Sequence, residues 1–314
     1  MASQQIFHVV KPGLMTTYQD MGRVGYQRFG VPVSGAMDRF SLQIANILVG
    51  NRRDEACLEV ALIGPELVAG QSMTIAITGA DLEPKVNGQP KRMWTSFRVE
   101  KGDRLTFGQQ HAGVYAYIAV AGGFDCPTFL GSKSTDVKSG FGSPLEKQDN
   151  ICGNPMITTA GVGIFPTSIP TYPKHVKVGV IEGPHTELFS HAERKHFYDK
   201  VHTLEANSNR MGYRLRTDTD QWKSKTSIWS DAVPIGAIQI PPNGQPIILM
   251  ADRQTTGGYP RIGTVISSDL PKVAQLIPRG KISFYPISVD KAQQYAIAME
   301  KYLRKLTIFR KYIH

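Results

Sequence analysis

The sequence predicts a mainly β fold with a few helices. Short runs rich in β-branched and aromatic residues recur along the 314-residue chain, and such runs are typical of strands. Glycine, proline, asparagine and aspartate separate the runs, as they do in turns. Far fewer segments show the 3.6-residue apolar period of an amphipathic helix. The predicted strands cover residues 73–78, 114–120, 175–181, 235–240, 246–250 and 281–287.

Three segments are predicted to be helices: residues 35–51, 186–200 and 288–306. The first follows the helical period and ends at Gly50, a stop signal. The third begins at Ser288, which can cap a helix. This third helix carries an apolar stripe that we expect to face the core: Tyr295, Met299, Tyr302 and Leu306. A shorter helix is expected near residues 269–277.

The composition is that of a soluble globular protein, with 41% apolar and 20% charged residues. No run approaches the roughly 18 apolar residues that a membrane helix needs, and the start, MASQQIFHVVKPG, does not resemble a secretion signal. We therefore expect a cytoplasmic protein. The net charge of +10 comes without a nucleic-acid-binding motif. It favours an anionic small substrate, a nucleotide or an acidic partner protein.

The cysteines and histidines give no metal or disulfide pattern. Cys57, Cys126 and Cys152 are far apart in the sequence, and an odd number without a CxxC pair argues against a disulfide framework or a zinc cluster. We expect them to be reduced and mostly buried. His191 and His196 are not spaced to share a helix face. No residue is therefore assigned as a metal ligand, and whether the activity needs a metal stays open.

The two halves of the sequence share a faint repeat. A Ser-x-x-Met turn occurs at Ser34 and again at Ser208, and each precedes a strand that ends in Ala-Asp, at Asp81 and Asp252. We interpret this as a duplication of one β-rich unit. The proline-rich segment 165–175 is the natural boundary between the halves. The expected domains are residues 1–168 and residues 174–314, the second ending in the C-terminal helix.

Two polar stretches stand out as candidate sites. MADRQTTGGYP, residues 250–260, follows a strand and presents an acid, a guanidinium, an amide, two hydroxyls and two glycines. Such a stretch is poor core material, although a surface turn has the same composition. The other stretch, residues 12–38, lies just before the first helix, whose free amides can bind an anion or an amide carbonyl.

Familiar catalytic patterns are absent from the sequence: GxSxG, HExxH, GxGxxG and GxxxxGK[ST]. The glycine-rich segment 122–143 contains Lys133, and its amides could cradle a phosphate. We favour a surface loop for this segment.

Several stretches together resemble the biotin-dependent carboxyltransferase domain family of the allophanate hydrolase subunit 2 type. The similarity extends from residue 5 to about residue 290. This family includes the C subunit of bacterial 5-oxoprolinase and the antagonist of a sporulation-kinase inhibitor. The stretches are PGLMTTYQDMGRVGYQRFGVPVSGAMD, LEVALIGPEL, ITGADL, YIAVAGGFD, LGSKST, EGPH, SNRMGYRL, GAIQIPPNGQPIILMADRQTTGGYP and IGTVISSDL.

The resemblance implies two tandem cyclophilin-like β-barrel subdomains. It also implies a protein that works with a B subunit, related to the kinase inhibitor, and an A subunit. Such complexes use ATP to cleave the lactam of 5-oxo-L-proline to L-glutamate. ATP would be a substrate of the complex, and no bound biotin is expected.

Two other functions stay open. The same module in urea carboxylase moves a carboxyl group from carboxybiotin to urea, but this sequence carries neither a biotin carboxylase nor a biotinyl Met-Lys-Met segment. We therefore favour the C subunit of 5-oxoprolinase. A non-catalytic partner that binds and neutralises a kinase inhibitor is the other alternative. Prolyl isomerase activity has no support beyond the expected barrel.

Lactam chemistry suggests roles for the polar residues. It needs donors at the carbonyl oxygen, an acceptor at the ring N–H and a cation for the carboxylate. Asp252 is the expected amide-facing carboxylate, with Gln254 reading the amide and Tyr259 closing over the ring. Replacing Asp252 with alanine is expected to abolish activity without lowering stability. The other expected substrate-binding residues are Arg253, Thr255, Thr256, Gly257, Gly258, Asn209, Arg210, Gln19, Arg28, Ser34 and Asp38.

Two of these residues have an equally simple structural interpretation. Arg253 can pair with a structural acid. Asp38 can cap the first helix.

Overall fold

The structure is a computed structural model that describes residues 3–217 and 227–313. It divides into two compact units. Unit 1 contains Met1–Arg23, Ser34–Tyr172 and Lys301–His314, and unit 2 contains Val24–Val33 and Pro173–Glu300. The main division lies inside the proline-rich segment 165–175. A boundary at that segment alone does not reproduce the two units. Residues 24–33 belong to unit 2 and residues 301–314 belong to unit 1.

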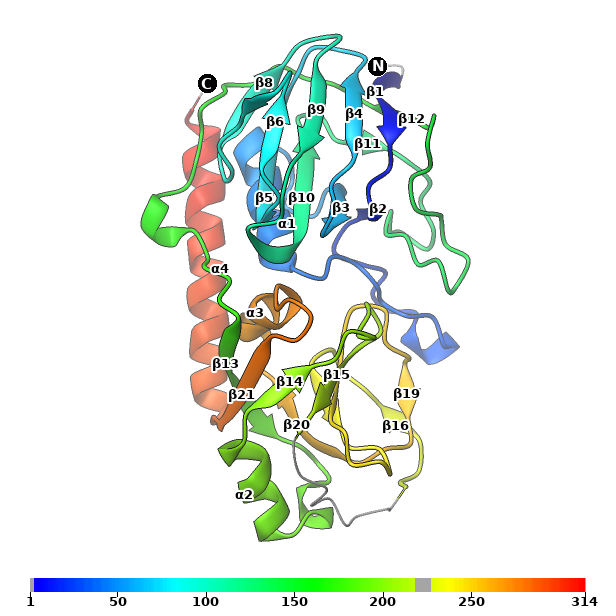
Figure 1. The fold of residues 1–314 in the computed structure, drawn as a ribbon, viewed down its shortest axis with the longest axis vertical. Helices are drawn as coiled ribbons and strands as arrows, with labels where there is room; N and C mark the ends of the chain where they lie inside the picture. The colour runs from blue at the N-terminus through cyan, green and yellow to red at the C-terminus, as the bar shows by residue number, and fades with distance from the viewer. Residues whose placement is uncertain (1–2, 218–226, 314) are drawn as a thin grey trace. The chain divides into compact units, whose positions relative to one another are not determined.

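Unit 1 contains two sheets (Figure 1). The seven-stranded sheet consists, in spatial order, of β11 (Phe124–Asp125), β12 (Asn150–Gly153), β1 (Gln4–Lys11), β4 (Glu66–Ala69), β9 (Arg104–Phe107), β6 (Pro84–Val86) and β7 (Gln89–Pro90). The five-stranded sheet consists of β2 (Met15–Gln19), β3 (Cys57–Ala61), β10 (Ala112–Val120), β5 (Met73–Asp81) and β8 (Ser96–Val99). All neighbouring strands of both sheets are antiparallel.

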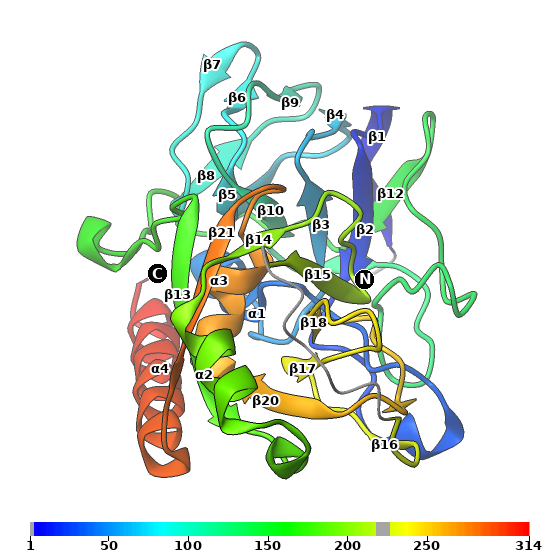
Figure 2. The ribbon, with the colours of Figure 1, turned by 60° about the horizontal axis from the view of Figure 1, so that its bottom comes forward.

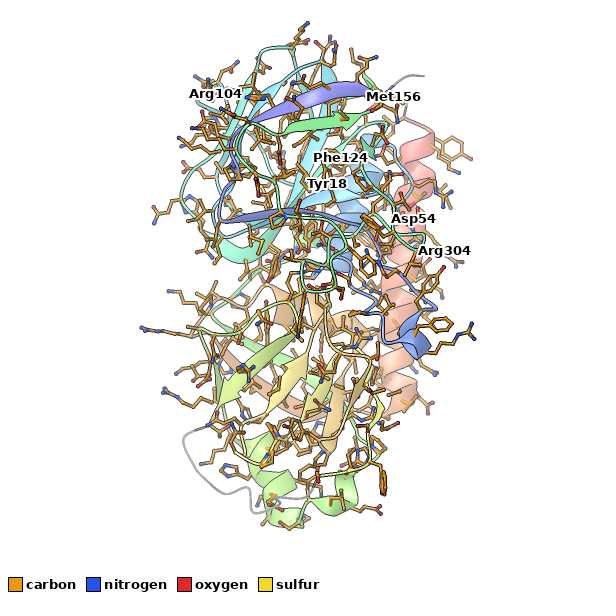
Figure 3. All side chains as sticks on the ribbon, turned by 90° about the vertical axis from the view of Figure 1, so that its right-hand side faces the viewer. Tyr18, Asp54, Arg104, Phe124, Met156 and Arg304 are labelled. Carbon is orange, nitrogen blue, oxygen red and sulfur yellow. The ribbon has the colours of Figure 1, made fainter. Side chains whose placement is uncertain are left out.

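The core of unit 1 lies between these two sheets. Ile6 and Phe7 of the larger sheet and Leu58, Ile75 and Ile118 of the smaller sheet are fully buried in one apolar cluster. Strands alternate their side chains between faces, so each sheet buries one face in this cluster. A register shift in β1 between Gln5 and Phe7 lets the consecutive residues Ile6 and Phe7 both enter it. At its edge Tyr18 and Phe124 meet edge to face, with ring centroids 5.7 Å apart, and both are labelled in Figure 3.

Helix α1 (Arg39–Val49) packs on β5 and β10 of unit 1. Asp38 caps its N-terminus, and Gly50 ends it in the left-handed conformation, at φ +85°. A left-handed residue costs glycine little because it lacks a Cβ. The predicted helix at residues 35–51 is thereby confirmed. The 3₁₀ turn η2 (Pro166–Ser168) lies near the end of this unit.

Unit 2 contains a closed barrel (Figure 2). Its strands follow the order β13 (His175–Glu182), β20 (Arg261–Val265), β17 (Ala237–Gln239), β18 (Ile247–Leu249), β15 (Gly212–Arg216), β14 (His202–Leu204) and β21 (Lys281–Pro286). The strands β16 (Asp231–Ala232) and β19 (Thr256–Gly257), which are not consecutive in the chain, pair in a separate two-stranded sheet. The mainly β fold is confirmed, and every predicted strand coincides with an observed one.

Short helices complete unit 2: η1 (Gln27–Phe29), η3 (Thr186–Leu188), α2 (His191–Asp199), η4 (Ser267–Asp269) and α3 (Leu270–Ala274). Helix α2 begins with a capping box in which Ser190 and Glu193 satisfy each other's backbone N–H groups. Phe197 of α2 stacks on Phe284 of the barrel, with centroids 4.5 Å apart. The predicted helices at residues 186–200 and 269–277 are confirmed in these shorter forms.

The C-terminal helix α4 (Val289–Lys311) corrects the predicted buried stripe. Ser288 accepts a hydrogen bond from the Lys291 N–H, as expected of a cap. Tyr295 is 41% exposed, whereas Leu303 and Arg310 are buried. Met299, Tyr302 and Leu306 are only half-buried. Arg310 takes a buried position because its Nε donates to the Leu48 carbonyl at the end of α1, 3.1 Å away.

Candidate active site

A cavity of about 570 Å³ lies on the outer face of the barrel in unit 2. The ladder places Gly212 opposite Leu249 and Arg214 opposite Ile247, and these side chains share one face. The alternate residue Tyr213 is buried on the barrel's inner face. Around this apolar floor stand the polar side chains Asn209, Arg214, Gln239, Asn243, Gln254 and Tyr259. Its size and mixed lining are those of a small-molecule site.

Three predicted site residues, Asn209, Gln254 and Tyr259, line this cavity together. Asn209 shapes the turn before β15, since its Oδ1 accepts from the Met211 N–H at 2.9 Å. Gln254 is exposed, and Tyr259 is 41% exposed. These three residues therefore lie at the cavity rather than in the core.

Gly257 allows two carboxamides to approach the same point. A Cβ added to Gly257 would lie 2.5 Å from Nε2 of Gln239 and 3.5 Å from Nε2 of Gln254. The first distance is shorter than real Cβ contacts allow, so any side chain at residue 257 would displace Gln239. The lack of a side chain at Gly257 thus has a steric basis.

Sequence reasoning missed Gln239 and Arg214. Gln239 ends the apolar strand β17 and is only 1% exposed. A glutamine within an apolar strand is a sequence signal for a functional residue, because glutamine is mostly exposed in proteins. Arg214 lies within the SNRMGYRL motif, on an alternating strand whose neighbours Tyr213 and Leu215 are buried. The pairing of β17 and β15 with β18 brings both residues to the cavity.

Asp252 and Arg210 form a bidentate ion pair. Nε and Nη2 of Arg210 lie 2.7 and 2.8 Å from the two carboxylate oxygens of Asp252. Their side chains are only 15% and 12% exposed, and the Asp252 N–H also donates to the Arg210 carbonyl at 2.9 Å. The pair ties the turn that carries Asn209 to the strand end that carries Gln254. Asp252 and Arg210, both expected to contact the substrate, are thus bound to each other in this structure.

Four other predicted residues lie in or beside the two-stranded sheet of β16 and β19 rather than in the cavity lining. Buried Arg253 donates through Nε to the Val233 carbonyl, 3.0 Å away. The Thr255 carbonyl accepts from the Val233 N–H at 3.1 Å. Thr256 pairs with Ala232 in the ladder. The Gly258 carbonyl accepts from the Ile228 N–H at 3.0 Å.

The predicted residues of unit 1 are buried and bonded within the fold. The Asp38 carboxylate accepts one hydrogen bond from the Ser41 N–H, at 3.0 Å, and another from the Ser41 hydroxyl, at 2.6 Å. The capping alternative is therefore the observed one. The Asp38 N–H donates to the Tyr117 hydroxyl at 2.7 Å, and that hydroxyl donates to Glu59 at 2.7 Å. Burial, with Glu59 adjacent, raises the pKa of Tyr117, so the phenol stays a donor.

Gln19 and Ser34 meet at one backbone carbonyl. Nε2 of Gln19 and Oγ of Ser34 lie 2.9 and 3.4 Å from the oxygen of Thr135. Both side chains are fully buried. Arg28 belongs to unit 2, where it is exposed and lies over the ring of Phe29 at 4.7 Å.

A carboxylate occupies the glycine-rich loop that could have cradled phosphate. Asp20 accepts from the hydroxyls of Ser132 and Ser134, at 2.7 and 2.5 Å, and from the Lys133 N–H at 2.7 Å. The Lys133 ammonium donates to Glu55 at 2.6 Å and to a backbone carbonyl. The sequence analysis did not predict this cluster, although the two serines of the LGSKST motif could have indicated it. In this structure both the ammonium and the backbone N–H of Lys133 are bonded to carboxylates of the fold.

The described ranges contain neither a metal-binding cluster nor a membrane helix. Within residues 3–217 and 227–313, no group of three or more His, Cys, Asp and Glu side chains is arranged to hold a metal ion. None of the helices in this part of the chain combines the length and apolar character needed to cross a membrane. Cys57 is buried, whereas Cys126 and Cys152 are half-buried.

Comparisons with known proteins match nearly the whole chain. The family described as "Carboxyltransferase domain, subdomain A and B" matches residues 29–286. The C subunit of the Haemophilus influenzae 5-oxoprolinase is 35% identical over 92% of this chain and 94% of its own length. The C subunit of the Escherichia coli 5-oxoprolinase is 34% identical over 95% of this chain and 96% of its own length.

Urea-processing enzymes match as well, through a fraction of their length. The urea amidolyase of Lachancea kluyveri is 32% identical over 92% of this chain and 17% of its own length. The crystal structure of the Kluyveromyces lactis urea carboxylase superposes with a TM-score of 0.89 at 29% identity. That match covers 98% of this chain and 29% of that one.

Proposed function

The chain belongs to the carboxyltransferase domain family with subdomains A and B, and we propose that it acts as the C subunit of an ATP-dependent 5-oxoprolinase. One observation carries the proposal: the chain aligns with two 5-oxoprolinase C subunits over nearly their full length. The urea amidolyase match spans only 17% of that enzyme. The proposed partners are A and B subunits, with ATP as a substrate of the complex.

The proposed reaction opens a resonance-stabilised lactam. The lactam oxygen attacks the γ-phosphorus of ATP, the bond to ADP breaks, and the carbonyl carbon becomes electrophilic. Water adds to that carbon, the C–N bond breaks and the nitrogen takes up a proton, which leaves an acyl phosphate. A second water hydrolyses the acyl phosphate to glutamate and phosphate. Preorganised donors at the changing oxygen are the main catalytic requirement.

The 570 Å³ cavity supplies groups for each part of 5-oxoproline. The carboxamides of Gln239 and Gln254, kept close by Gly257, can donate to the lactam oxygen and accept from the ring N–H. Arg214 supplies a guanidinium for the substrate carboxylate. Tyr259 stands at the opening as a cover for the ring. We assign these four side chains to substrate contact.

Asp252 and Arg210 act in this proposal as positioning residues. Their ion pair links the two segments that present Asn209 and Gln254. Each carboxylate oxygen accepts one bond from Arg210. The pair therefore fixes the cavity wall without contacting the lactam itself.

Reconstitution tests the proposal. The chain is mixed with its A-type and B-type partner proteins, ATP and 5-oxoproline, and glutamate and phosphate release are measured. We expect glutamate only when all three proteins and ATP are present. Complete mixtures that form a complex but release no glutamate would overturn the proposal.

A second candidate, the carboxyltransferase step of a urea carboxylase-like system, is favoured by the superposition on the K. lactis enzyme. A parallel reaction with urea and a carboxybiotin donor tests it, with carboxylated urea as the product. If neither reaction proceeds while the complex still assembles, the non-catalytic role of neutralising a B-type kinase inhibitor is the function that remains.

A further inference from the structure

A second cavity, of about 590 Å³, lies on the barrel of unit 2. Its lining comes from β14, the residues that follow β14, the end of β15 and the turn before β21: Thr203, Leu204, Glu205, Ala206, Asn207, Arg216 and Arg279. Figure 1 shows β14 between β15 and β21. Two guanidinium groups, a hydroxyl and an amide thus surround one hollow, with Glu205 as the single acid in the lining.

Cations continue across the neighbouring strands. The ladders place Thr203 opposite Arg216 on one side and opposite Lys281 on the other. Lys281 in turn pairs with His175 of β13. Side chains directly across a ladder share a face, so these residues form one row on the barrel surface. The face around the cavity is therefore strongly positive.

Among the described residues, no ion pair neutralises the cations of this face. In the part of the chain that the structure describes, the side chains of Arg216, Arg279 and Lys281 take part in no ion pair or hydrogen bond. By contrast, Arg210 and Arg261 of the same barrel each pair with an aspartate. Uncompensated guanidinium groups at a cavity are suited to a phosphate or carboxylate ligand.

Arg279 occupies its place at a backbone cost. Its φ is +66°, in the left-handed region that favours glycine. Two backbone hydrogen bonds hold it there: the Arg279 N–H donates to the Leu204 carbonyl, and the Leu204 N–H donates to the Gly280 carbonyl, each at 2.9 Å. A side chain retained at such a position is a reason to look for a functional role.

Strand β15 joins this cavity to the proposed lactam cavity. Arg214 lines the lactam cavity and Arg216 lines the second one. They are two residues apart on the same face of the strand, a spacing of about 7 Å. A phosphoryl donor held at Arg216 would therefore lie close to an acceptor held at Arg214.

We propose that the cavity between Arg216 and Arg279 binds the phosphate chain of a nucleoside triphosphate. This inference rests on the proposed function, which needs ATP beside the lactam. The two guanidinium groups and Thr203 hold the β- and γ-phosphates, and Asn207 donates a further hydrogen bond. The γ-phosphorus then exchanges its bond to the ADP oxygen for a bond to the oxygen of the lactam whose carboxylate Arg214 holds.

Binding of ATP tests the site on the full chain and on the reconstituted complex. Calorimetry compares the wild type with Arg216→Ala, Arg279→Gly and the control Lys305→Ala, which removes an exposed cation of α4 in unit 1. Glycine suits the left-handed backbone at residue 279, so Arg279→Gly removes the guanidinium without unfolding the turn. We expect each arginine variant to weaken ATP binding about tenfold or more, with the control unchanged.

Competition and kinetics identify the ligand group. Tripolyphosphate should displace ATP, whereas AMP should not. In the complex, both arginine variants should raise the KM for ATP and leave the KM for 5-oxoproline unchanged. Equal ATP affinity in the wild type and both variants, or ATP binding by neither the chain nor the complex, would overturn the site.

Two further outcomes separate this inference from its premise. If the arginine variants keep ATP affinity but lose a partner protein, the face is a protein interface and the phosphate site is wrong. If ATP binding depends on both arginines while wild-type complexes release no glutamate, the phosphate site stands and the lactam assignment fails.

Discussion

The polar candidates of the two units differ in what their side chains contact. In unit 1, Gln19 and Asp38 are fully buried, and they bond to a backbone carbonyl and to the first turn of α1. In unit 2, Gln254 and Tyr259 face a cavity together with Arg214. The difference teaches that a polar residue near a helix start or a strand end indicates a binding site only when its side chain lines a cavity. A polar side chain that bonds to other groups of the fold has a structural role.

The two Ala-Asp strand ends make the same distinction on a smaller scale. Asp81 closes β5 and accepts from the Glu83 N–H two residues later, at 3.0 Å. Asp252 follows β18 and instead binds Arg210 from a distant turn. The first is a local turn, while the second braces a cavity wall. A shared sequence pattern has thus been put to different structural uses.

The largest expected effect is on catalysis through Gln254. Removing one donor from a developing oxyanion costs on the order of 100-fold in turnover, so Gln254→Ala should slow glutamate release by about that factor. Gln254 is exposed, and the free energy of unfolding should change by less than about 0.5 kcal/mol. Steady-state kinetics and urea unfolding measure the two quantities. Turnover within a few-fold of wild type would remove Gln254 from the site.

Breaking the Asp252–Arg210 pair should lower stability as well as activity. Asp252→Ala leaves a largely buried guanidinium without its carboxylate, at a cost of about 1–3 kcal/mol for this partly exposed pair. Urea unfolding of both single variants and the double variant Asp252→Ala/Arg210→Ala gives the coupling energy. Additive effects would show that the pair contributes nothing. This replaces the expectation that stability would be unaffected.

Loss of the Asp38 cap should affect stability alone. Asp38→Ala removes the acceptor of the Ser41 N–H and hydroxyl, which should cost about 1–2 kcal/mol. Asp38→Asn, which keeps a capping oxygen, should restore most of it. Glutamate release per folded molecule should stay near wild type for both variants. A large loss of turnover in the stable Asn variant would return Asp38 to the substrate contacts.

The features that the sequence predicted correctly were those set by residues close together in the chain. The period of α1 and its Gly50 stop were sufficient to place that helix, and the alternation of residues 175–181 placed β13. Gln239 and Arg214 were missed because they meet only through a strand ladder. The partner of Asp252 lies 42 residues away in the chain. The prediction of the buried face of α4 was wrong because Arg310 binds the end of α1.

A smaller effect is expected at Gly257. Gly257→Ala would place a Cβ against Nε2 of Gln239 and push that carboxamide from its position. The KM for 5-oxoproline should rise about three- to tenfold, as for the loss of one ordinary hydrogen bond. Gly258→Ala is the matched control, since a Cβ there meets the Ile228 carbonyl at an ordinary 3.4 Å. Equal KM values for the two variants would contradict the steric argument.

The smallest effect is a pH dependence of unit 2. Burial lowers the pKa of His202, whose Nε2 lies 3.0 Å from the Phe197 carbonyl and whose Nδ1 lies 2.7 Å from the Thr217 hydroxyl. The unfolded chain therefore takes up the proton first. This contribution to stability is complete above about pH 6.5, the unfolded pKa, and declines as the pH falls below it. His202→Gln should flatten that decline in urea unfolding.

Hydrogen exchange on the reconstituted complex, with and without 5-oxoproline, compares the two units in one measurement. The account predicts that substrate slows exchange in residues 209–214 and 254–259, which border the barrel cavity. Exchange in residues 16–23 and 34–41 should not change. Protection confined to those two segments of unit 1, with none at the barrel cavity, would contradict the central claim that unit 2 holds the working site.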